Sequence, residues 1–285
     1  MSQPIRTIVI VGGGTAGWIT AGTLAAAHPH DTENGVQITL VESPGIPQIG
    51  VGEGTWPTMR DTLRRMGVSE SDFIRECNVA LKQGAWFANW VSDQPGEGYY
   101  HPLVLPQGFL RGNLVPAWQR QKDQFQSFAH AICPQAELCD RGLAPKQAAT
   151  PEFAAVQNYA YHLDAGALSG FIQRHCVEKL GVRHVLADVT SVETHENGDV
   201  AAVVTEQAGA IAGHLFIDCT GFRSLLLGQH FGVAFRDRSD SLFIDKALAV
   251  HLPYHDENDA IACHTISTGQ SSGWIWDIGL YNRRG

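Results

Sequence analysis

The sequence predicts an α/β fold built on a parallel sheet, and three segments near its N-terminus support this. The segment Ile5–Val11 is apolar except for Arg6 and Thr7, and such a segment is typical of a strand buried on both faces. The alanine-rich segment Thr15–Ala27 has no internal proline and predicts a helix directly after it. A second apolar run, Val36–Glu42, completes a βαβ unit.

Length and composition predict one large domain with a subdomain inserted or appended. The chain has 285 residues and 44% hydrophobic content, which is enough to bury a sizeable core. A formal net charge of -9 and a pI near 5.8 argue against binding to nucleic acid or to anionic lipid. We therefore expect neither a nucleic-acid partner nor a membrane partner.

The segment after the βαβ unit is less regular. A loop rich in glycine and proline, Ser43–Thr55, precedes two predicted helices, Pro57–Met66 and Ser69–Cys77, the second with Ser69 as its N-cap. Ala80–Val91 alternates enough to predict one strand. From Ser92 to about Pro151 the pattern dissolves, which is typical of an elaboration built over a site.

Regular structure returns in the second half. Asp164 is a plausible N-cap for a helix that runs to Leu180. Buried or alternating segments then predict strands at Val182–Ala187, Val189–Thr194, Asp199–Thr205 and His214–Cys219, with a hairpin turn at Asn197-Gly198. The remainder, Ala247–Leu280, predicts three antiparallel strands.

The turn between the first strand and the first helix carries a dinucleotide-binding fingerprint. Its residues are Gly12, Gly13, Gly14, Thr15, Ala16 and Gly17. In a GxGxxG motif the first glycine permits a tight turn, the second lets the backbone approach a pyrophosphate, and the third lets helix and strand pack closely. The helix N-terminus favours the phosphates, and Glu42 would accept hydrogen bonds from the adenosine ribose.

Two further segments bear on which dinucleotide is bound. Leu215–Gly221 reads as a strand that ends in a Thr-Gly turn, similar to the second turn of FAD-binding two-domain oxidoreductases, and this favours FAD over NAD. The glycine-dense loop Gly50–Thr55 would let the backbone approach a planar ring closely, although a flexible surface loop explains it equally well.

Cysteine and histidine spacing predicts no metal site. The six cysteines show no CxxC spacing, and the thirteen histidines form no HExxH motif. Reduced, mostly buried thiols indicate a cytoplasmic protein. The apolar stretch Ile8–Ala27 is better explained by the fingerprint than by a signal peptide, because glycines interrupt it.

Lys82 and two tryptophans are the other candidates for function. On a regular strand Lys82 shares a face with Trp86 and Trp90, so it is either a lysine that snorkels at a strand end or a desolvated amine with a lowered pKa. Trp274 and Trp276 share a face of a predicted strand with Ile278. They are either ordinary core or an aromatic wall around a reactive intermediate.

Taken together, the motifs resemble the flavin-dependent halogenases of the tryptophan-halogenase type, over the whole length of the chain. The matching segments are Gly12–Trp18 (GGGTAGW), Gly50–Thr55 (the GVGExT loop), Lys82 after Cys77-Asn78, Tyr161–Asp164, Phe216–Gly221 and Trp274–Ile278 (WIWDI, similar to the WxWxIP signature). The resemblance implies an FAD-binding Rossmann-like fold of the two-domain flavoprotein monooxygenase type, with an added antiparallel sheet and a substrate-side insertion.

What the resemblance implies for chemistry is specific. A separate flavin reductase would supply FAD as FADH2, and oxygen with chloride or bromide would then give hypohalous acid. This reagent would halogenate a small aromatic substrate, tryptophan or another indole or phenol. Lys82 would hold the hypohalite, His101 would line the substrate pocket, and Trp274, Trp276 and Ile278 would separate the flavin site from it. Gly50, Val51, Gly52, Glu53 and Gly221 would contact the cofactor.

The sequence also departs from the family pattern. Gly279 stands where the signature has proline, and Leu103 stands where tryptophan-specific members tend to carry an aromatic residue. Family members continue past Gly285 with a catalytic glutamate and a halide-binding segment. An aromatic monooxygenase and a truncated FAD-binding fragment without turnover therefore stay open, as does a homodimer.

The resemblance also divides the chain by function. Residues 1–91 with 160–230 would form the FAD-binding domain, and 92–159 the substrate-side insertion. Residues 231–285 would place antiparallel strands with the WxW motif over the flavin.

Overall fold

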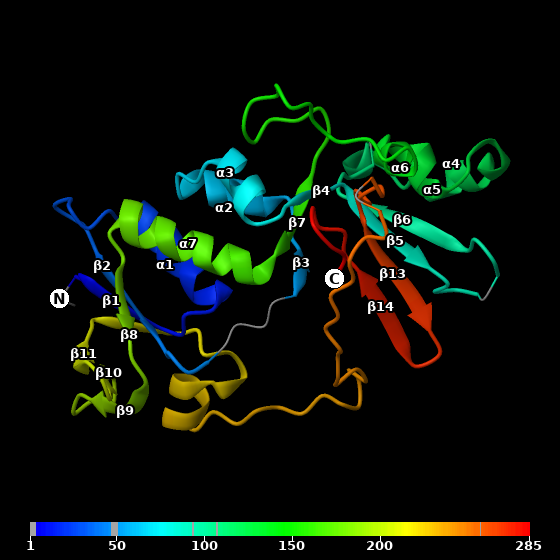
Figure 1. The fold of residues 1–285 in the computed structure, drawn as a ribbon. Helices are drawn as coiled ribbons and strands as arrows, with labels where there is room; N and C mark the ends of the chain where they lie inside the picture. The colour runs from blue at the N-terminus through cyan, green and yellow to red at the C-terminus, as the bar shows by residue number, and fades with distance from the viewer. Residues whose placement is uncertain (1–3, 47–50, 93, 107, 257) are drawn as a thin grey trace. The chain divides into compact units, whose positions relative to one another are not determined.

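The computed structural model describes residues 4–46, 51–92, 94–106, 108–256 and 258–285 (Figure 1). The chain forms two compact units. Unit 1 consists of Met1–Ile49, Arg65–Val68 and Gly166–Asp245, and unit 2 consists of Gly50–Arg64, Ser69–Ala165 and Lys246–Gly285. These units do not follow the division by function expected above, which stays a prediction: most of residues 50–91, expected with the FAD-binding part, belong to unit 2.

Unit 1 is built on a four-stranded parallel sheet in the order β12-β1-β2-β8. Its strands are β1 (Thr7–Val11), β2 (Gln37–Glu42), β8 (Arg183–Leu186) and β12 (Leu215–Asp218). The helix α1 (Thr15–Ala27) connects β1 to β2, and α7 (Ala165–Leu180) precedes β8. The structure thus confirms the α/β fold with a parallel sheet that the sequence predicts.

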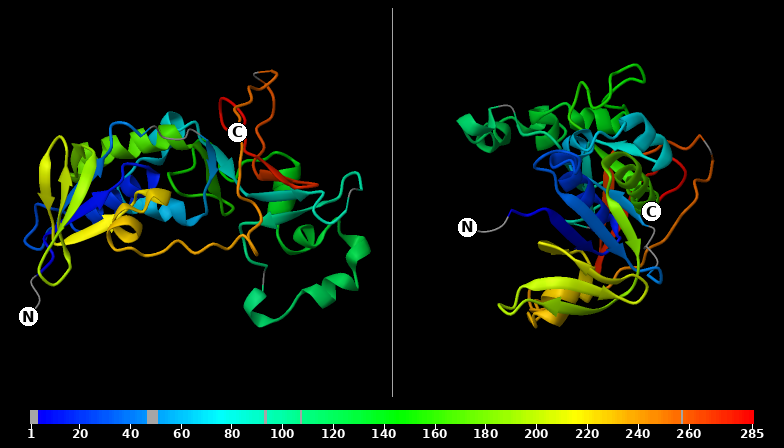
Figure 2. Two further views of the ribbon diagram at one scale, coloured as in Figure 1. Left: turned by 90° about the horizontal axis from the view of Figure 1, so that it is seen from below. Right: turned by 90° about the vertical axis from the view of Figure 1, so that its left-hand side faces the viewer.

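The two faces of this sheet are covered differently (Figure 2, right). On one face α1 packs so closely that a side chain at Gly17 would overlap the carbonyl oxygen of Gly12, and one at Gly22 would overlap Met66 and the thiol of Cys176 on α7. On the other face Val9 and Val41 pack against Val203 of a three-stranded antiparallel sheet. That sheet consists of β9 (Val189–Thr194), β10 (Val200–Thr205) and β11 (Gly209–Ala212), and it begins with the predicted hairpin.

Unit 2 contains two smaller sheets. A mixed sheet has the order β14-β13-β5-β6, and an antiparallel sheet has the order β3-β7-β4. Their strands are β3 (Gly52–Gly54), β4 (Ala80–Lys82), β5 (Gly84–Ala88), β6 (Gly98–Pro102), β7 (Ala160–Asp164), β13 (Thr265–Gln270) and β14 (Gly273–Asp277).

Short helices accompany these sheets. They are α2 (Thr58–Arg65), α3 (Glu70–Glu76), α4 (Val115–Gln119), α5 (Phe128–Ile132) and α6 (Gln135–Asp140), with 3-10 turns at Phe109–Arg111, Lys122–Gln124 and Gly221–Arg223 and a π turn at Leu225–His230. The predicted cap of α3 is confirmed, because the Ser69 hydroxyl accepts a hydrogen bond from the Asp72 N–H at 3.2 Å. Asp164, expected as the N-cap of the next helix, is the last residue of β7 and directly precedes α7, and its carboxylate pairs with Arg283 at 2.7 Å.

The prediction of one strand over Ala80–Val91 is wrong. The segment forms β4 and β5, which belong to different sheets and are separated by Gln83. Gln83 is fully buried, and its N–H donates to the carbonyl of Cys263 at 2.7 Å while its side-chain amide donates to Leu143. These long-range bonds turn the chain from one sheet into the next. The expected shared face of Lys82, Trp86 and Trp90 therefore does not exist.

The prediction of three antiparallel strands over Ala247–Leu280 also needs correction. Among the described residues of this segment only β13 and β14 are regular strands, and β13 runs parallel to β5. The stretch before β13 makes only an isolated bridge, from Leu252 to Arg284. Several apolar residues of this stretch, including Leu248, are exposed, so its apolar pattern does not indicate a buried strand.

A buried carboxylate anchors unit 2. The side chain of Glu70 at the start of α3 is 1% exposed and accepts hydrogen bonds from the hydroxyls of Tyr159 at 2.5 Å and Tyr161 at 2.7 Å. Lys146 donates to the other carboxylate oxygen at 2.7 Å, and the Phe153 N–H donates to the same atom. Burial alone would raise the pKa of Glu70, but these donors together hold its pKa below the ordinary value of 4.5.

We predict that Glu70→Gln destabilises the protein by about 3 kcal/mol at pH 7, because it leaves the Lys146 ammonium buried without a counter-charge. Since the folded pKa of Glu70 is lowered, its contribution is fully present above pH 4.5 and is lost as the pH falls through the folded value. The difference in free energy of unfolding between wild type and variant, measured by urea denaturation, should therefore shrink from pH 7 towards pH 3.

The matched control is Glu137→Gln, which breaks the exposed pair with Arg141 and should cost less than about 1 kcal/mol. Equal losses for the two variants would show that the Glu70 network does not anchor the unit. A difference that grows towards low pH would contradict the assigned direction of the pKa.

Candidate active site

The glycine turn of unit 1 has the geometry that a dinucleotide fingerprint requires. Gly12 has a φ of 116°, and a side chain there would overlap the carbonyl oxygen of Cys219. Gly14 is exposed and is the N-cap of α1, with no side-chain cap and no acidic residue in the first turn, which begins with Thr15 and Ala16. The first N–H groups of α1 can therefore bind a phosphate.

Glu42 lies where the fingerprint expects it. Its side chain covers Gly13, since a Cβ there would overlap the carboxyl group. Its Oε2 atom lies 2.9 Å from His184 Nε2, but both atoms are buried without a hydrogen bond of acceptable geometry among the described residues. A ribose hydroxyl would satisfy such an acceptor.

The second predicted turn lies beside the first. Cys219 N–H donates to the carbonyl of Val11 at 2.8 Å, so the turn before Gly221 is joined to the end of β1. Asp218 holds this turn together, because its carboxylate accepts hydrogen bonds from Thr220 and from the N–H of Leu226. Gly221 has a φ of 60°, and no atom lies within 4 Å of a Cβ built there.

In unit 2 the loop Gly50–Thr55 becomes part of a sheet. Gly50 itself lies outside the described residues, and the carbonyl of Val51 accepts a hydrogen bond from Ala165 at 3.0 Å. Gly52 begins β3, and a Cβ there would contact Ile278 at 3.5 Å. Burial raises the pKa of Glu53. Ile278 is 1% exposed, so the structure brings the end of the WIWDI motif onto this loop.

Lys82 is a buried lysine at the end of β4. Its side chain is 8% exposed, its Nζ lies 3.4 Å from the carbonyl oxygen of Thr55, and the same atom is 5.5 Å from the centre of the Trp56 ring. Burial lowers the pKa of Lys82, because the charged form loses hydration. Among the described residues no ion pair involves Lys82. The sequence left Lys82 as either a lysine that snorkels at a strand end or a desolvated amine. The structure shows the desolvated amine.

A neutral histidine accompanies this lysine. His162 is fully buried on β7, and its Nε2 lies 2.8 Å from Thr265 Oγ1. Burial, and next the charge of Lys82, lower the pKa of His162 to about 3. The imidazole thus stays uncharged at neutral pH, and Lys82 is the cation of this cluster.

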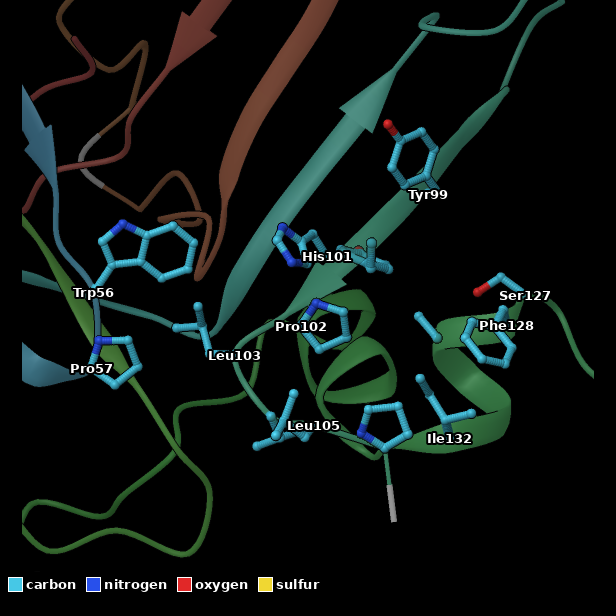
Figure 3. Close-up of a pocket in the computed structure, with 14 residues that line it drawn as sticks. Trp56, Pro57, Tyr99, His101, Pro102, Leu103, Leu105, Ser127, Phe128 and Ile132 are labelled. Atoms are coloured by element: carbon cyan, nitrogen blue, oxygen red, sulfur yellow. The ribbon is translucent and has the colours of Figure 1, made fainter. Parts of the chain in front are cut away.

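Trp56 also lines a pocket of unit 2, which has a volume of about 620 Å³ (Figure 3). The predicted substrate residue His101 lies in its wall, 6.4 Å from the Trp56 ring, together with Leu103. Phe128 and Ile132 of α5 line the pocket as well. The lysine and the pocket therefore share one aromatic side chain.

Trp274 and Trp276 do not line this pocket. They lie on the edge strand β14, are 46% and 47% exposed, and Trp274 contacts Trp90 at 6.2 Å between ring centres. The sequence analysis also missed two residues of the lysine cluster. Trp56 follows the glycine loop directly, which was a usable signal, and His162 lies in the segment Tyr161–Asp164, which matches the family but was given no role.

Comparison with known proteins places the chain in a family. The family model described as tryptophan halogenase matches residues 7–285. The chain is 34% identical over 303 residues to tryptophan 6-halogenase ThaL of Streptomyces albogriseolus, covering 100% of this chain and 55% of that protein. The chain belongs to the tryptophan halogenase family.

Solved structures agree. A tryptophan halogenase from Shewanella frigidimarina superposes with a TM-score of 0.94 at 48% identity, covering 99% of this chain and 55% of that one. Xcc4156, a flavin-dependent halogenase from Xanthomonas campestris, has a TM-score of 0.85 at 33% identity, covering 99% and 55%. The fold class is thereby confirmed as that of FAD-binding halogenases, and the chain spans about half the length of these relatives.

We predict that Lys82, one of five lysines in the chain, titrates below the ordinary range of a lysine side chain, because its ammonium is buried without a carboxylate partner among the described residues. A pH titration of protein labelled with ¹³C at lysine Cε, followed by NMR, measures this directly. Lys82→Arg should remove the displaced resonance and leave the other four in place. A spectrum in which all five lysines titrate together would contradict the desolvation of Lys82.

Proposed function

We propose that the protein acts as a flavin-dependent halogenase on tryptophan or another small indole- or phenol-type aromatic. The observation that carries this proposal is the buried, unpaired Lys82 against Trp56, which itself lines an apolar pocket. The names of the relatives support it, since they include tryptophan 6- and 7-halogenases. The chain spans about half the length of these relatives.

The residues present fit FAD. The first turn of α1 would hold the pyrophosphate, and Glu42 offers a buried carboxylate oxygen for the ribose. Gly221, with open space around its Cβ position, would contact the cofactor. The family resemblance assigns the loop that contains Val51, Gly52 and Glu53 to cofactor contact as well. When bound, reduced FAD would supply the electrons with which oxygen and chloride or bromide yield hypohalous acid.

Lys82 would hold and polarise hypohalous acid. An ammonium group donates hydrogen bonds, and its charge favours the electron density that develops on oxygen as halogen is transferred. Burial makes this interaction stronger than it would be in water. The neutral His162 leaves Lys82 as the one charged donor in the cluster of Thr55, His162 and Thr265.

The pocket would hold the aromatic substrate. Its walls combine Trp56, His101, Leu103 and Phe128, which suit a flat, electron-rich ring. Leu103 offers no stacking surface, and this keeps indoles other than tryptophan and phenols among the candidates. Residues 92–159 provide most of the lining, in line with a substrate-side role for this segment.

The remaining assignments follow from this function. A separate flavin reductase would deliver FADH2. The protein would form a homodimer and would act in the cytoplasm. Trp274, Trp276 and Ile278 would separate the flavin from the lysine site. Among the described residues no helix is long and apolar enough to cross a membrane.

A second candidate function is an FAD-binding module without turnover. A third, aromatic hydroxylation on the same fold, needs no halide. Assays with reductase, NADH, FAD and bromide separate the three, because brominated products show a characteristic isotope pattern.

We predict that Gly14→Ala weakens FAD binding by at least about tenfold, because the added methyl group takes up space at the phosphate site. The fold should survive, since no atom lies within 4 Å of a Cβ at this position. Isothermal titration with FAD measures the affinity. The control is Gly170→Ala in α7, where a Cβ meets only Arg174, and it should bind FAD like the wild type. Wild-type affinity in Gly14→Ala would show that the turn does not hold the cofactor.

We predict that Lys82→Ala lowers halogenation by at least about 100-fold and leaves FAD affinity unchanged, because Lys82 acts on the halogen donor. The assay uses the protein as the cell produces it and detects brominated product by mass spectrometry. Lys122→Ala, which removes an exposed lysine of the same unit, is the control and should keep wild-type activity. Unchanged halogenation in Lys82→Ala would overturn the role of Lys82, and hydroxylated product alone would favour the monooxygenase.

A further inference from the structure

Two cysteines and a histidine from distant parts of unit 2 meet behind the pocket wall. Cys139 lies on α6, and Cys263 and His264 directly precede β13. One potential ligand atom from each, the two sulfurs and an imidazole nitrogen, lie within 4.8 Å of one another. Neither cysteine forms a disulfide. The fold has thus gathered three side chains that bind transition metals.

The burial and bonding of these side chains set the group apart from a chance contact. Cys139 and Cys263 are 6% and 8% exposed, and their thiols are hydrogen-bonded to each other. His264 Nδ1 is buried and has no hydrogen-bond partner among the described residues. An unpaired imidazole nitrogen is costly to bury. This cost would disappear if Nδ1 bound a metal ion, or if Nδ1 gained a hydrogen-bond partner while the ring bound the metal through its other nitrogen.

Polar groups surround the cluster in an ordered way. The ring of Tyr100 packs perpendicular to His264 at 5.3 Å, and its hydroxyl donates to Asp140, the neighbour of Cys139, at 2.7 Å. His130 Nε2 lies 2.8 Å from the other oxygen of Asp140. Such outer groups restrict the orientation of metal ligands. Here Tyr100 packs against the ring of His264, and Tyr100 and His130 both bind the carboxylate of Asp140 on α6.

The chemistry of the three ligands selects the metal. Two sulfurs and one imidazole are poor ligands for Mg²⁺ or Ca²⁺, which prefer oxygen, and are a common set for Zn²⁺. We propose that Cys139, Cys263 and His264 bind a zinc ion, with a water molecule as the fourth ligand. The thiol protons would be displaced as the metal binds. This proposal does not depend on the proposed halogenase function.

The consequence is structural. Helix α6 has only six residues and packs against α5, whose Phe128 and Ile132 line the pocket. Helices of this length have little stability of their own. Zinc would tie α6 to the chain before β13 and so hold one wall of the pocket in place. Spacing rules did not reveal the site, because Cys139 and Cys263 are far apart in the sequence.

The test measures metal binding by the whole chain. Reduced, chelator-treated protein is dialysed against zinc chloride, washed, and analysed for metal content, and Co²⁺ is added to a second sample. We expect about one zinc per chain. We also expect a visible Co²⁺ spectrum with thiolate-to-cobalt charge transfer. Cys139→Ser and Cys263→Ser should lower the zinc content more than about tenfold.

Three further variants keep the test decisive. Cys133→Ser removes a buried cysteine outside the group and should retain zinc. His264→Cys preserves three ligands and should retain metal with stronger charge transfer, whereas His264→Asn should lose it. Circular dichroism establishes that each variant is folded. The proposal is overturned if reduced wild type binds no more zinc than Cys139→Ser, or if isolated protein is two hydrogens lighter through a Cys139–Cys263 disulfide and takes up no zinc after reduction.

Discussion

The pairing of β7 with β3 on one side and β4 on the other is the constraint on which the lysine site depends. β7 carries Tyr161, which binds Glu70, and His162, which binds Thr265. Through its two neighbours it brings Lys82 to the carbonyl of Thr55. A single central strand thus aligns a glycine loop, a lysine and a buried histidine that come from three separate parts of the sequence.

Two buried charges in unit 2 are treated in opposite ways. Glu70 is surrounded by four donors, so its charge is stabilised and holds the loop that carries Lys146 against α3. Lys82 has a carbonyl, an aromatic ring and the neutral His162 nearby but no carboxylate partner among the described residues, so its charge is destabilised by burial. The first arrangement contributes to stability. The second costs stability and leaves donors free for a reacting molecule, which is typical of functional sites.

Local patterns predicted much of unit 1 and less of unit 2. The two central strands of the parallel sheet, β1 and β2, are buried on both faces, so their apolar runs reveal them without knowledge of their partners. In unit 2 the segment Ala80–Val91 looks like one strand, yet the backbone and side chain of Gln83 bond to Cys263 and Leu143 and divide it. Bonds between distant residues leave no local pattern, so this break could not be predicted.

The sequence by itself determined the glycine turn, the βαβ unit and the membership of the halogenase family, because glycines at a tight turn and apolar runs report local backbone requirements. Only the tertiary structure decided that Lys82 is buried beside Trp56, that Trp56 lines a pocket with His101, and that Cys139 meets Cys263 and His264. These features depend on desolvation and on contacts between distant segments. Both arise only when the chain has folded.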